Sequence, residues 1–339
     1  MQALLDDDAS ARVVCLVEPR MEQAAREAAS ALERVEILAG DITERRLGLG
    51  AEDYDRLAAE TTAVFHLAAV YDLAVPLEIA QKVNVEGTGN IIELCRHCQK
   101  LVRHNYVSTA YVAGTRKNVV YEHELVMGQW FKNHYEATKF QAEVWVRESM
   151  DEVPTSVYRP AIVVGDSRTG ETQKFDGPYY MLRAINFSHK RGLPITKYGR
   201  SAAPFNVVPV DFVVNGIMAG SRDPDAASKT FHLVDPEPIS AGEVFTLLSE
   251  LYASRKPSYT LPAGPVALAL RAKPVRKLFQ GIPSESITYL NHDVRYDARC
   301  ASELLERNGL RLPRFGEYAQ TIVRYFREHE DDPAFAPAL

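Results

Sequence analysis

The amino-acid sequence predicts a doubly wound α/β fold, in which helices cover both faces of a parallel sheet. Short runs rich in β-branched residues alternate with longer helical patterns through the first half of the chain. Turn-forming residues stand at the ends of several runs, as they do at Gly40 and Gly165. Such alternation is typical of parallel strands joined by right-handed helical crossovers. After Asp166 the alternation loosens, and a smaller, mostly helical second part is predicted.

The strands expected in the first half are short apolar runs, and helical patterns separate them. The strands occupy 12–17, 35–38, 63–69, 102–108 and 156–164. The helices occupy 21–33, part of 76–99, and a segment that carries Tyr135 and Lys139.

The second half follows a polar loop at 166–177. We expect a helix near 179–190, strands near 205–211 and 230–234, and a helix at 212–219 between those strands. From about residue 239 the pattern is mostly helical, with many prolines. The predicted division is therefore a larger domain of 1–165 with about 205–235, and a smaller lobe of about 166–204 with 236–339.

The composition describes a globular protein with no expected nucleic-acid partner. The 339 residues are 46% hydrophobic and 25% charged, and the net charge is -6. An acidic chain of this kind offers no broad cationic face to phosphates. No apolar run reaches the ~18 residues that span a bilayer, and the first residues lack the pattern of a signal peptide. Four cysteines do not make a disulfide framework in a chain of this length, so a reducing cytoplasm is expected.

Cys95 and Cys98, with His97 between them, raise the question of a metal or redox site. They lie near the end of a helical pattern, and no second Cys/His pair follows at the spacing of a zinc site. We interpret them as helix-packing residues and expect no metal.

A tyrosine and a lysine four positions apart, Tyr135 and Lys139, indicate proton chemistry. This spacing places both side chains on one helix face, where an ammonium lowers the pKa of a phenol. Ser108 and Thr109 follow an apolar run and present hydroxyl groups at the end of a strand. Hydroxyl groups and a cation around one carbonyl oxygen suit hydride chemistry with a nicotinamide cofactor.

The spacing by itself is not specific, because Tyr252 and Lys256 repeat it. That second pair lies among polar residues just before Pro257, and no Ser/Thr-bearing strand precedes it. We interpret it as a solvated helix end.

Six motifs occur in an order that resembles the extended short-chain dehydrogenase/reductase superfamily, also called the NAD-dependent epimerase/dehydratase superfamily. They are Gly40–Thr43, His66–Ala69, Val83–Thr88, Ser108–Gly114, Tyr158–Asp166 and Val208–Asp211. The resemblance covers almost the whole chain. The sequences of several segments are most similar to those of the branch that holds thioester reductases, fatty acyl-CoA reductases and male-sterility proteins.

The resemblance implies a Rossmann-like fold, in which the larger domain binds a dinucleotide and the smaller lobe binds the substrate. It implies catalytic roles for Thr109, Tyr135 and Lys139, and it places Asn84 where it stabilises the central strands. The cofactor-binding residues that it implies are Asp41, Ile42, Leu67, Ala68, Ala69, Ser108, Lys139, Tyr158, Pro160 and Ile162. Taken singly, several of these residues have structural interpretations, since an Asp after a strand often caps the next helix.

The choice between NAD and NADP depends on the end of the second strand of such a fold. An acid there binds the 2′-hydroxyl of NAD, whereas an arginine accepts the 2′-phosphate of NADP. This chain has both, as Glu18 and Arg20. Relatives in the acyl-reducing branch usually carry arginine where Glu18 stands, so the choice stays open.

The first strand and the Gly-x-x-Gly-x-x-Gly loop of the superfamily are missing from the sequence. Met1–Asp8 reads as the tail of the helix that follows this loop, and 12–17 reads as the second strand. Without the first strand the sheet would keep a central slot with unpaired backbone groups. Three explanations are open: a start codon assigned too late or a fragment, a degenerate relative that does not bind the cofactor, and completion of the sheet by another chain.

The function that these observations favour is an NAD(P)-dependent oxidoreductase that transfers hydride to a carbonyl or an acyl thioester. A nucleotide-sugar epimerase or dehydratase uses the same residues, and a non-catalytic dinucleotide-binding or regulatory protein is the alternative of another class. The expected partners are a small-molecule or acyl-thioester substrate, free or bound to a carrier protein, and a second copy in a homodimer. An apolar stretch at 261–280 with basic residues suits a phosphopantetheine arm or a peripheral membrane contact. Those basic residues are Arg271, Lys273, Arg276 and Lys277. The alternative for this stretch is a solvated helix that packs on the smaller lobe.

Overall fold

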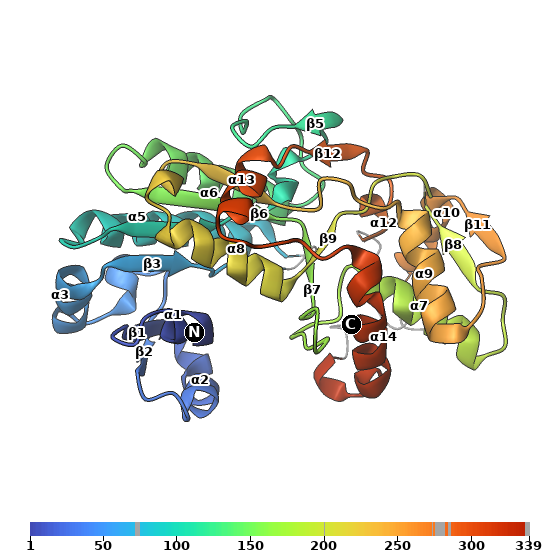
Figure 1. Ribbon diagram of the computed structural model, residues 1–339, viewed down its shortest axis with the longest axis horizontal. Helices are drawn as coiled ribbons and strands as arrows, with labels where there is room; N and C mark the ends of the chain where they lie inside the picture. The colour runs from blue at the N-terminus through green and yellow to red at the C-terminus, as the bar shows by residue number, and fades with distance from the viewer. Residues whose placement is uncertain (72–74, 200, 273, 275–281, 284–285, 336–339) are drawn as a thin grey trace. The chain divides into compact units, whose positions relative to one another are not determined.

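The computed structural model in Figure 1 describes residues 1–71, 75–199, 201–272, 274, 282–283 and 286–335. Two compact units divide the chain, and each is built from several segments. The first unit comprises Met1–Ser108, Asn133–Tyr158 and Ile217–Thr230, and the second comprises Thr109–Lys132, Arg159–Gly216 and Phe231–Leu339. Lys273, Arg276 and Lys277, three of the basic residues in the predicted 261–280 stretch, lie outside the described residues.

The strands are short, and the expected ones are present within a few residues of their predicted bounds. They are β1 (Val13–Val17), β2 (Val35–Ala39), β3 (Ala63–His66), β4 (Arg103–Val107), β5 (Asn118–Val120), β6 (Thr155–Pro160), β7 (Ile162–Val164), β8 (Thr196–Tyr198), β9 (Val207–Pro209), β10 (Thr230–Leu233), β11 (Tyr259–Leu261) and β12 (Val294–Tyr296). The run at 156–164 is two strands, because β6 pairs with β4 whereas β7 pairs with β9.

The helices alternate with the strands in the first half and dominate the C-terminal part, as predicted. They are α1 (Gln2–Asp7), α2 (Glu22–Ala29), α3 (Ala51–Glu60), α4 (Leu77–Ala80), the π-helical turn η3 (Gln81–Glu86), α5 (Gly87–His97), α6 (His134–Glu148), α7 (Pro178–Lys190), α8 (Val210–Arg222), α9 (Ala241–Ala253), α10 (Ala263–Leu270), α12 (Ser286–Tyr289), α13 (Arg299–Arg307) and α14 (Phe315–His329). Short 3-10 turns are η1 (Pro19–Met21), η2 (Arg45–Gly48), η4 (Ala110–Ala113), η5 (Pro224–Ala226) and η6 (Pro333–Phe335).

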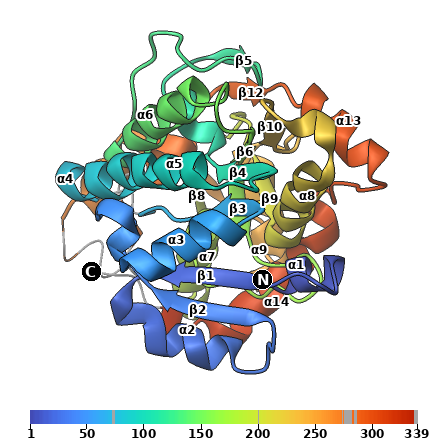
Figure 2. The same ribbon diagram turned by 90° about the vertical axis from the view of Figure 1, so that its left-hand side faces the viewer.

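The main sheet has the strand order β10-β6-β4-β3, which Figure 2 shows from top to bottom. β3, β4 and β6 pair in parallel, with Phe65 opposite Asn105 and Tyr106 opposite Val157. β1 and β2 form a separate parallel pair, in which Cys15 lies opposite Ile37. Among the described strands, none pairs with the second edge of β1 or of β3. Leu16 of β1, Leu38 of β2 and Val64 of β3 nevertheless pack against one apolar cluster. The β1–β2 pair and β3 therefore belong to the same unit.

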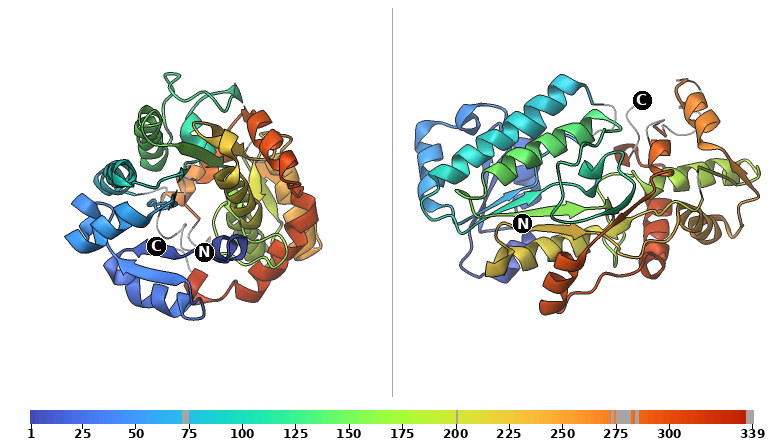
Figure 3. Two further views of the ribbon diagram at one scale, coloured as in Figure 1. Left: turned by 60° about the vertical axis from the view of Figure 1, so that its left-hand side comes forward. Right: turned by 90° about the horizontal axis from the view of Figure 1, so that it is seen from above.

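Alternating side chains of β4 and β6 bury both faces of the sheet. Tyr106 and Val157 pack against Ile92 of α5 and Ala142 and Val146 of α6. These two helices lie side by side, as Figures 2 and 3 show. On the other face the Tyr158 hydroxyl donates to Asn105 Oδ1 at 3.0 Å and lies close to Gly220 of α8. Nearly all residues of both strands are therefore buried.

The second unit is built around an apolar cluster that α7, α9 and α14 share. α9 begins with a capping box, in which Ser240 and Glu243 bond to each other's backbone N–H groups. Glu122 is a buried carboxylate that accepts hydrogen bonds from the backbone N–H groups of His232, Cys300 and Ala301. It thereby joins three distant segments of this unit.

The second tyrosine–lysine pair, Tyr252 and Lys256, differs from its prediction at one of the two residues. Lys256 is exposed and pairs with Glu250, in keeping with a solvated helix end. Tyr252 is only 6% exposed, and its hydroxyl donates to Glu330 at 2.7 Å. The predicted exposure of Tyr252 was wrong, because its partner comes from the distant end of α14.

In the part of the chain that the structure describes, no helix is long and apolar enough to cross a membrane. No group of His, Cys, Asp and Glu side chains in the same part could hold a metal ion. Cys95 is buried in the cluster around α3 and α5, as its interpretation as a packing residue requires.

Candidate active site

Candidate cofactor residues follow the carboxyl ends of four strands in the first unit. Glu18 follows β1, Asp41 follows β2, Leu67 follows β3 and Ser108 follows β4. Ligands of open parallel sheets bind at this end of the strands. Leu67 and Ala68 are exposed and Ala69 is half-buried, so this strand end is accessible.

Asp41 is held in a tight turn. Its Oδ1 accepts the backbone N–H of Thr43 at 2.8 Å, and this hydrogen bond lowers the pKa of the carboxyl group. Ile42 packs on Gly87, where an added Cβ would lie 2.8 Å from Ile42 Cδ1. The Ile42 carbonyl accepts Asn90 Nδ2 at 2.7 Å. The glycine at 87 is thus needed for the close approach of α5 to this turn.

Glu18 and Arg20, which bear on the cofactor preference, bind each other. Arg20 Nε lies 2.7 Å from Glu18 Oε1, and both side chains are largely exposed. The acid and the arginine therefore lie side by side after β1 and form an ion pair with no net charge.

α6 carries Tyr135 and Lys139 on one face, as predicted. The helix begins at Asn133, whose side chain accepts the backbone N–H of Glu136 at 3.0 Å. Tyr135 lies in the first turn, half-buried, with its ring centroid 5.0 Å from that of Tyr71 in an edge-on arrangement. Lys139 follows one turn later and is only 2% exposed.

Lys139 is directed at the end of β4. Its Nζ donates to the Tyr106 hydroxyl at 2.9 Å and to the Val107 carbonyl at 2.8 Å. Burial lowers the pKa of this ammonium from 10.5 to about 7, and the nearby carboxylate of Glu143 opposes that shift. A lysine that titrates near neutrality can change its charge in response to small changes around it.

Ser108 and Glu143 form a second buried contact beside Lys139. The Ser108 hydroxyl donates to Glu143 Oε2 at 2.6 Å. Arg147 Nε lies 3.0 Å from Glu143 Oε1, and Arg147 Nη2 donates to Thr230 Oγ1 at 3.0 Å. The sequence analysis missed Tyr106 and Glu143. The position of Glu143, four residues after Lys139 on the same helix face, was the signal that could have identified it.

Asn84 joins two parts of the site. Its Oδ1 accepts the backbone N–H of Val70, in the segment after β3, at 2.9 Å. Its Nδ2 donates to Thr138 Oγ1 of α6 at 3.0 Å. Asn84 lies in the π-helical turn η3, a feature that is frequent at functional sites. It therefore links α6 to the segment after β3.

The remaining predicted residues lie elsewhere in the fold. Thr109, Pro160 and Ile162 belong to the second unit. Thr109 is buried at the start of η4, where its Oγ1 accepts the backbone N–H of Tyr111 at 3.2 Å. The side chain of Tyr158 is fully buried in the first unit against Asn105 and α8. Ser108 and Lys139 are thus the predicted residues that the first unit brings together at the end of β4, and Tyr135 stands one turn before Lys139 on α6.

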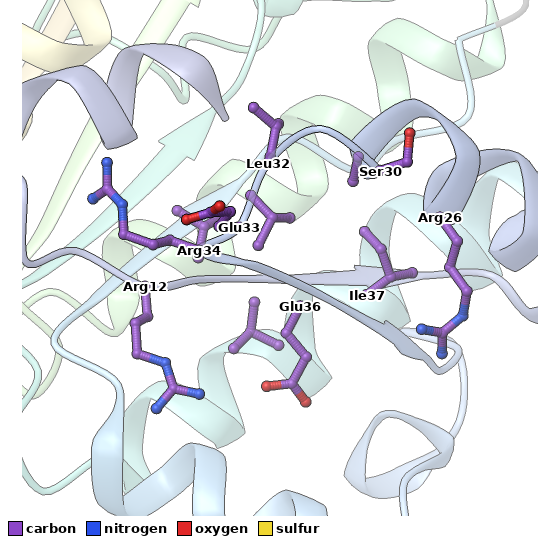
Figure 4. A pocket seen from close by; sticks show the side chains of 12 residues that line it. Arg12, Arg26, Ser30, Leu32, Glu33, Arg34, Glu36 and Ile37 are labelled. Atoms are coloured by element: carbon purple, nitrogen blue, oxygen red, sulfur yellow. The ribbon is translucent and has the colours of Figure 1, made fainter.

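A pocket of about 520 Å³ lies elsewhere in the first unit (Figure 4). It is lined by residues of β1, β2, α2 and the turn between α2 and β2, among them Arg12, Arg26 and Arg34. None of the predicted site residues lines it, and Arg12 and Arg34 stand before the amino ends of their strands. It is therefore distinct from the candidate active site.

The geometry of the first unit suits proton transfer to a carbonyl oxygen. An ammonium and a hydroxyl group stand at one strand end, and a phenol stands one helical turn before the ammonium. The ammonium lies in a low-dielectric environment where its charge acts strongly.

Comparison with known proteins is consistent with this chemistry. Residues 1–217 match the model of a family of NAD-binding domains that is described as male sterility protein. A component of the linear gramicidin synthase of Brevibacillus parabrevis is 29% identical over 203 residues, which cover 58% of the chain and 4% of the relative. A fatty acyl-CoA reductase of Drosophila melanogaster is 26% identical over 218 residues, which cover 56% of the chain and 41% of the relative. The chain thus corresponds to less than half the length of each of these relatives.

A solved structure has the same fold over nearly the whole chain. It is the terminal R domain from the myxalamid PKS-NRPS biosynthetic pathway, with a TM-score of 0.79 and 24% sequence identity. The likeness covers 98% of this chain and 88% of the R domain.

Proposed function

The chain belongs to the male sterility protein family of NAD-binding domains, within the extended short-chain dehydrogenase/reductase superfamily, and from this we propose that it is a reductase of acyl thioesters. The proposed reaction converts an acyl thioester and a reduced nicotinamide cofactor, with one proton, to an aldehyde, a free thiol and the oxidised cofactor. The substrate is carried on coenzyme A or on the phosphopantetheine arm of a carrier protein.

One observation carries this proposal: Tyr135 and Lys139 stand on one face of α6, and Lys139 reaches the end of β4 beside Ser108. This segment lies within the residues that match the family. One of the relatives is a fatty acyl-CoA reductase, which supports an acyl thioester as the substrate. A gramicidin synthase and an R domain of a PKS-NRPS pathway support a carrier-bound substrate.

The residues at the strand ends fit a dinucleotide. In the proposed assignment Asp41 and Ile42 face the adenine, while Leu67, Ala68 and Ala69 line the adenosine. Ser108 and Lys139 hold the nicotinamide ribose. The resemblance assigns the motif with Tyr158, Pro160 and Ile162 to the nicotinamide, and Tyr158 would take part through its backbone, because its side chain is buried against Asn105 and α8. Glu18 and Arg20 contact the adenosine ribose. Because Asp41 is a hydrogen-bonded anion with a lowered pKa, it accepts the amino group of an adenine well.

When bound, the nicotinamide cofactor supplies the hydride that reduces the carbonyl carbon. In this proposal Tyr135 donates its phenolic proton to the oxygen that gains negative charge. Thr109, for which the resemblance implies a catalytic hydroxyl group, belongs to the second unit. Lys139 favours the ionised form of the phenol and so helps Tyr135 to give up its proton. These interactions strengthen as charge forms on the oxygen, which is the condition for catalysis.

The test is an assay of the polypeptide as its gene encodes it, with NADH and NADPH in parallel. The substrates are octanoyl-CoA, octanal and UDP-glucose. We expect oxidation of one cofactor with octanoyl-CoA, with release of free coenzyme A and formation of octanal. Octanol would require a second equivalent of the reduced cofactor, and the parallel assay with octanal measures that step. Turnover of UDP-glucose alone would replace the proposal by an epimerase or dehydratase function. A protein that binds neither cofactor would be a non-catalytic member of the family.

A further inference from the structure

Glu143 is a fully buried acid that the proposed reaction does not use directly. Its side chain is 0% exposed, and it stands on α6 one turn after Lys139 and two turns after Tyr135. A buried carboxylate costs free energy unless cations and hydrogen-bond donors surround it. Glu143 has such partners on two sides.

On one side Glu143 binds Ser108. The Ser108 hydroxyl donates to Oε2 at 2.6 Å, and the Ser108 backbone N–H donates to the Tyr158 carbonyl at 2.7 Å. These two hydrogen bonds fix both the backbone and the side chain of the first residue after β4. Without the carboxylate, the hydroxyl group of Ser108 would be free to rotate to another acceptor.

On the other side Glu143 binds Arg147, which lies toward the outside of the helix and is 23% exposed. Arg147 is held in turn by Thr230 at 3.0 Å. The inner neighbour of Glu143 along the same helix face is Lys139, which is four residues away. The carboxylate therefore lies between two cations, one near solvent and one in the site.

We propose that Glu143 is a positioning residue of this site: it orients Ser108 at the end of β4 and supplies the buried negative charge that keeps Lys139 protonated. This inference rests on the proposed function, because it explains how the lysine of that site stays a cation although it is buried. The conservative change Glu143→Gln keeps the shape of the side chain and an oxygen acceptor for Ser108, but it removes the charge.

Other titratable groups around Lys139 do not supply this charge. Tyr106 of β4 accepts the Lys139 hydrogen bond, and burial raises its pKa, so the phenol stays neutral. Burial lowers the pKa of His66 of β3, so the imidazole also stays neutral. Tyr135 of α6 is the proton donor in the proposed reaction.

The experiment follows the titration of Lys139 by the ¹³Cε shift of the lysine side chain in the full polypeptide, with the signal assigned through Lys139→Arg. In Glu143→Gln we expect the midpoint to fall by about one pH unit or more, because an opposite charge at short range is lost. Glu148→Gln makes the same chemical change on the exposed side of the same helix. It should leave the midpoint where it is in the wild-type protein.

The second readout is the pH profile of kcat/KM for the reduction of octanoyl-CoA. In Glu143→Gln the alkaline limb should move toward lower pH by the same amount as the titration midpoint. Ser108→Ala should lower kcat/KM at every pH without moving this limb, because the charge of Glu143 remains. A role of Glu143 in folding alone would reduce the activity at all pH values and leave the limb in place.

The outcomes separate this inference from the proposed function. The nuclear magnetic resonance titration needs no turnover, so an inactive wild-type protein would overturn the proposed reaction and still decide the role of Glu143. An unchanged Lys139 midpoint in Glu143→Gln would overturn the role of Glu143. Should Glu143→Gln not fold, Glu143→Asp keeps the charge and is expected to keep the midpoint within about 0.3 unit. A fall of about one unit in Glu143→Asp would contradict the inference.

Discussion

The hydrogen bond between Lys139 and Tyr106 gives a prediction about stability that depends on pH. Tyr106 is fully buried, and its hydroxyl accepts Lys139 Nζ at 2.9 Å. Tyr106→Phe removes this acceptor and leaves the Val107 carbonyl, at 2.8 Å, as the other acceptor of Lys139. The loss should be larger when Lys139 is charged, because hydrogen bonds to charged groups contribute about 1.5–3 kcal/mol and neutral ones about 1 kcal/mol.

The sign of the pH dependence follows from the pKa of Lys139, which burial lowers to about 7 in the folded protein from its usual 10.5. The folded protein binds fewer protons at this site than the unfolded chain between these two pKa values, so the site makes stability rise with pH in that window. Tyr106→Phe lowers the folded pKa further, since it removes a partner of the charged form. The variant should therefore lose about 2 kcal/mol near pH 5.5 and about 1 kcal/mol near pH 8.5.

The assay is urea unfolding of the wild type and the variant at both pH values. Tyr158→Phe is the matched control, because Tyr158 is also fully buried in the same sheet and its hydroxyl donates to the neutral side chain of Asn105. That variant should lose about 1 kcal/mol at both pH values. Equal losses in Tyr106→Phe at the two pH values would refute the reasoning, since they would mean that Lys139 does not change charge in this window.

Further variants test the contacts of Asn84, Gly87 and Glu122. Asn84→Ala should cost about 2–3 kcal/mol in urea unfolding and lower kcat/KM, because Val70 and Thr138 both lose their partner; a fully active variant of unchanged stability would contradict the role of Asn84. Gly87→Ala should cost about 1–2 kcal/mol, because its Cβ would lie 2.8 Å from Ile42 Cδ1. Ile42→Val in the same protein should recover at least about 0.5 kcal/mol of that loss in a double-mutant cycle, and strict additivity would exclude the contact. In the second unit Glu122→Ala should cost about 2–3 kcal/mol, because three backbone N–H groups lose their acceptor, whereas Glu122→Gln, which keeps one oxygen, should cost less; the reverse order in thermal unfolding would refute this.

The parts of the fold that the sequence predicted are those in which local pattern and burial agree. β4 and β6 are buried on both faces and carry Tyr and Val residues between turn-forming segments, and α6 carries a cap, a tyrosine and a lysine at helical spacing. β5 and β12 were not predicted, because strands of three residues that pair across a long stretch of chain have no local periodicity. The division of 156–164 into β6 and β7 depends on two different partner strands, which no local pattern contains.

The candidate site shows the same limit. Ser108, Tyr135 and Lys139 could be predicted because residue type and order point to their chemistry. Tyr106 and Glu143 were missed because what they do depends on partners in other elements: Tyr106 of β4 binds a lysine of α6, and Glu143 of α6 binds a serine that follows β4. Tyr252 was misjudged for the same reason, since Glu330 is its partner.

The central claim is that Tyr135 gives its proton to the substrate oxygen, and Tyr135→Phe tests it most directly. The measurement is the single-turnover rate of octanoyl-CoA reduction together with the Kd of the reduced cofactor. Tyr252→Phe is the control, because it makes the same change in the second tyrosine–lysine pair. We predict a rate more than about tenfold lower in Tyr135→Phe, an unchanged Kd of the cofactor, and a normal rate in Tyr252→Phe. A Tyr135→Phe enzyme that reduces the thioester at the wild-type rate would contradict the account.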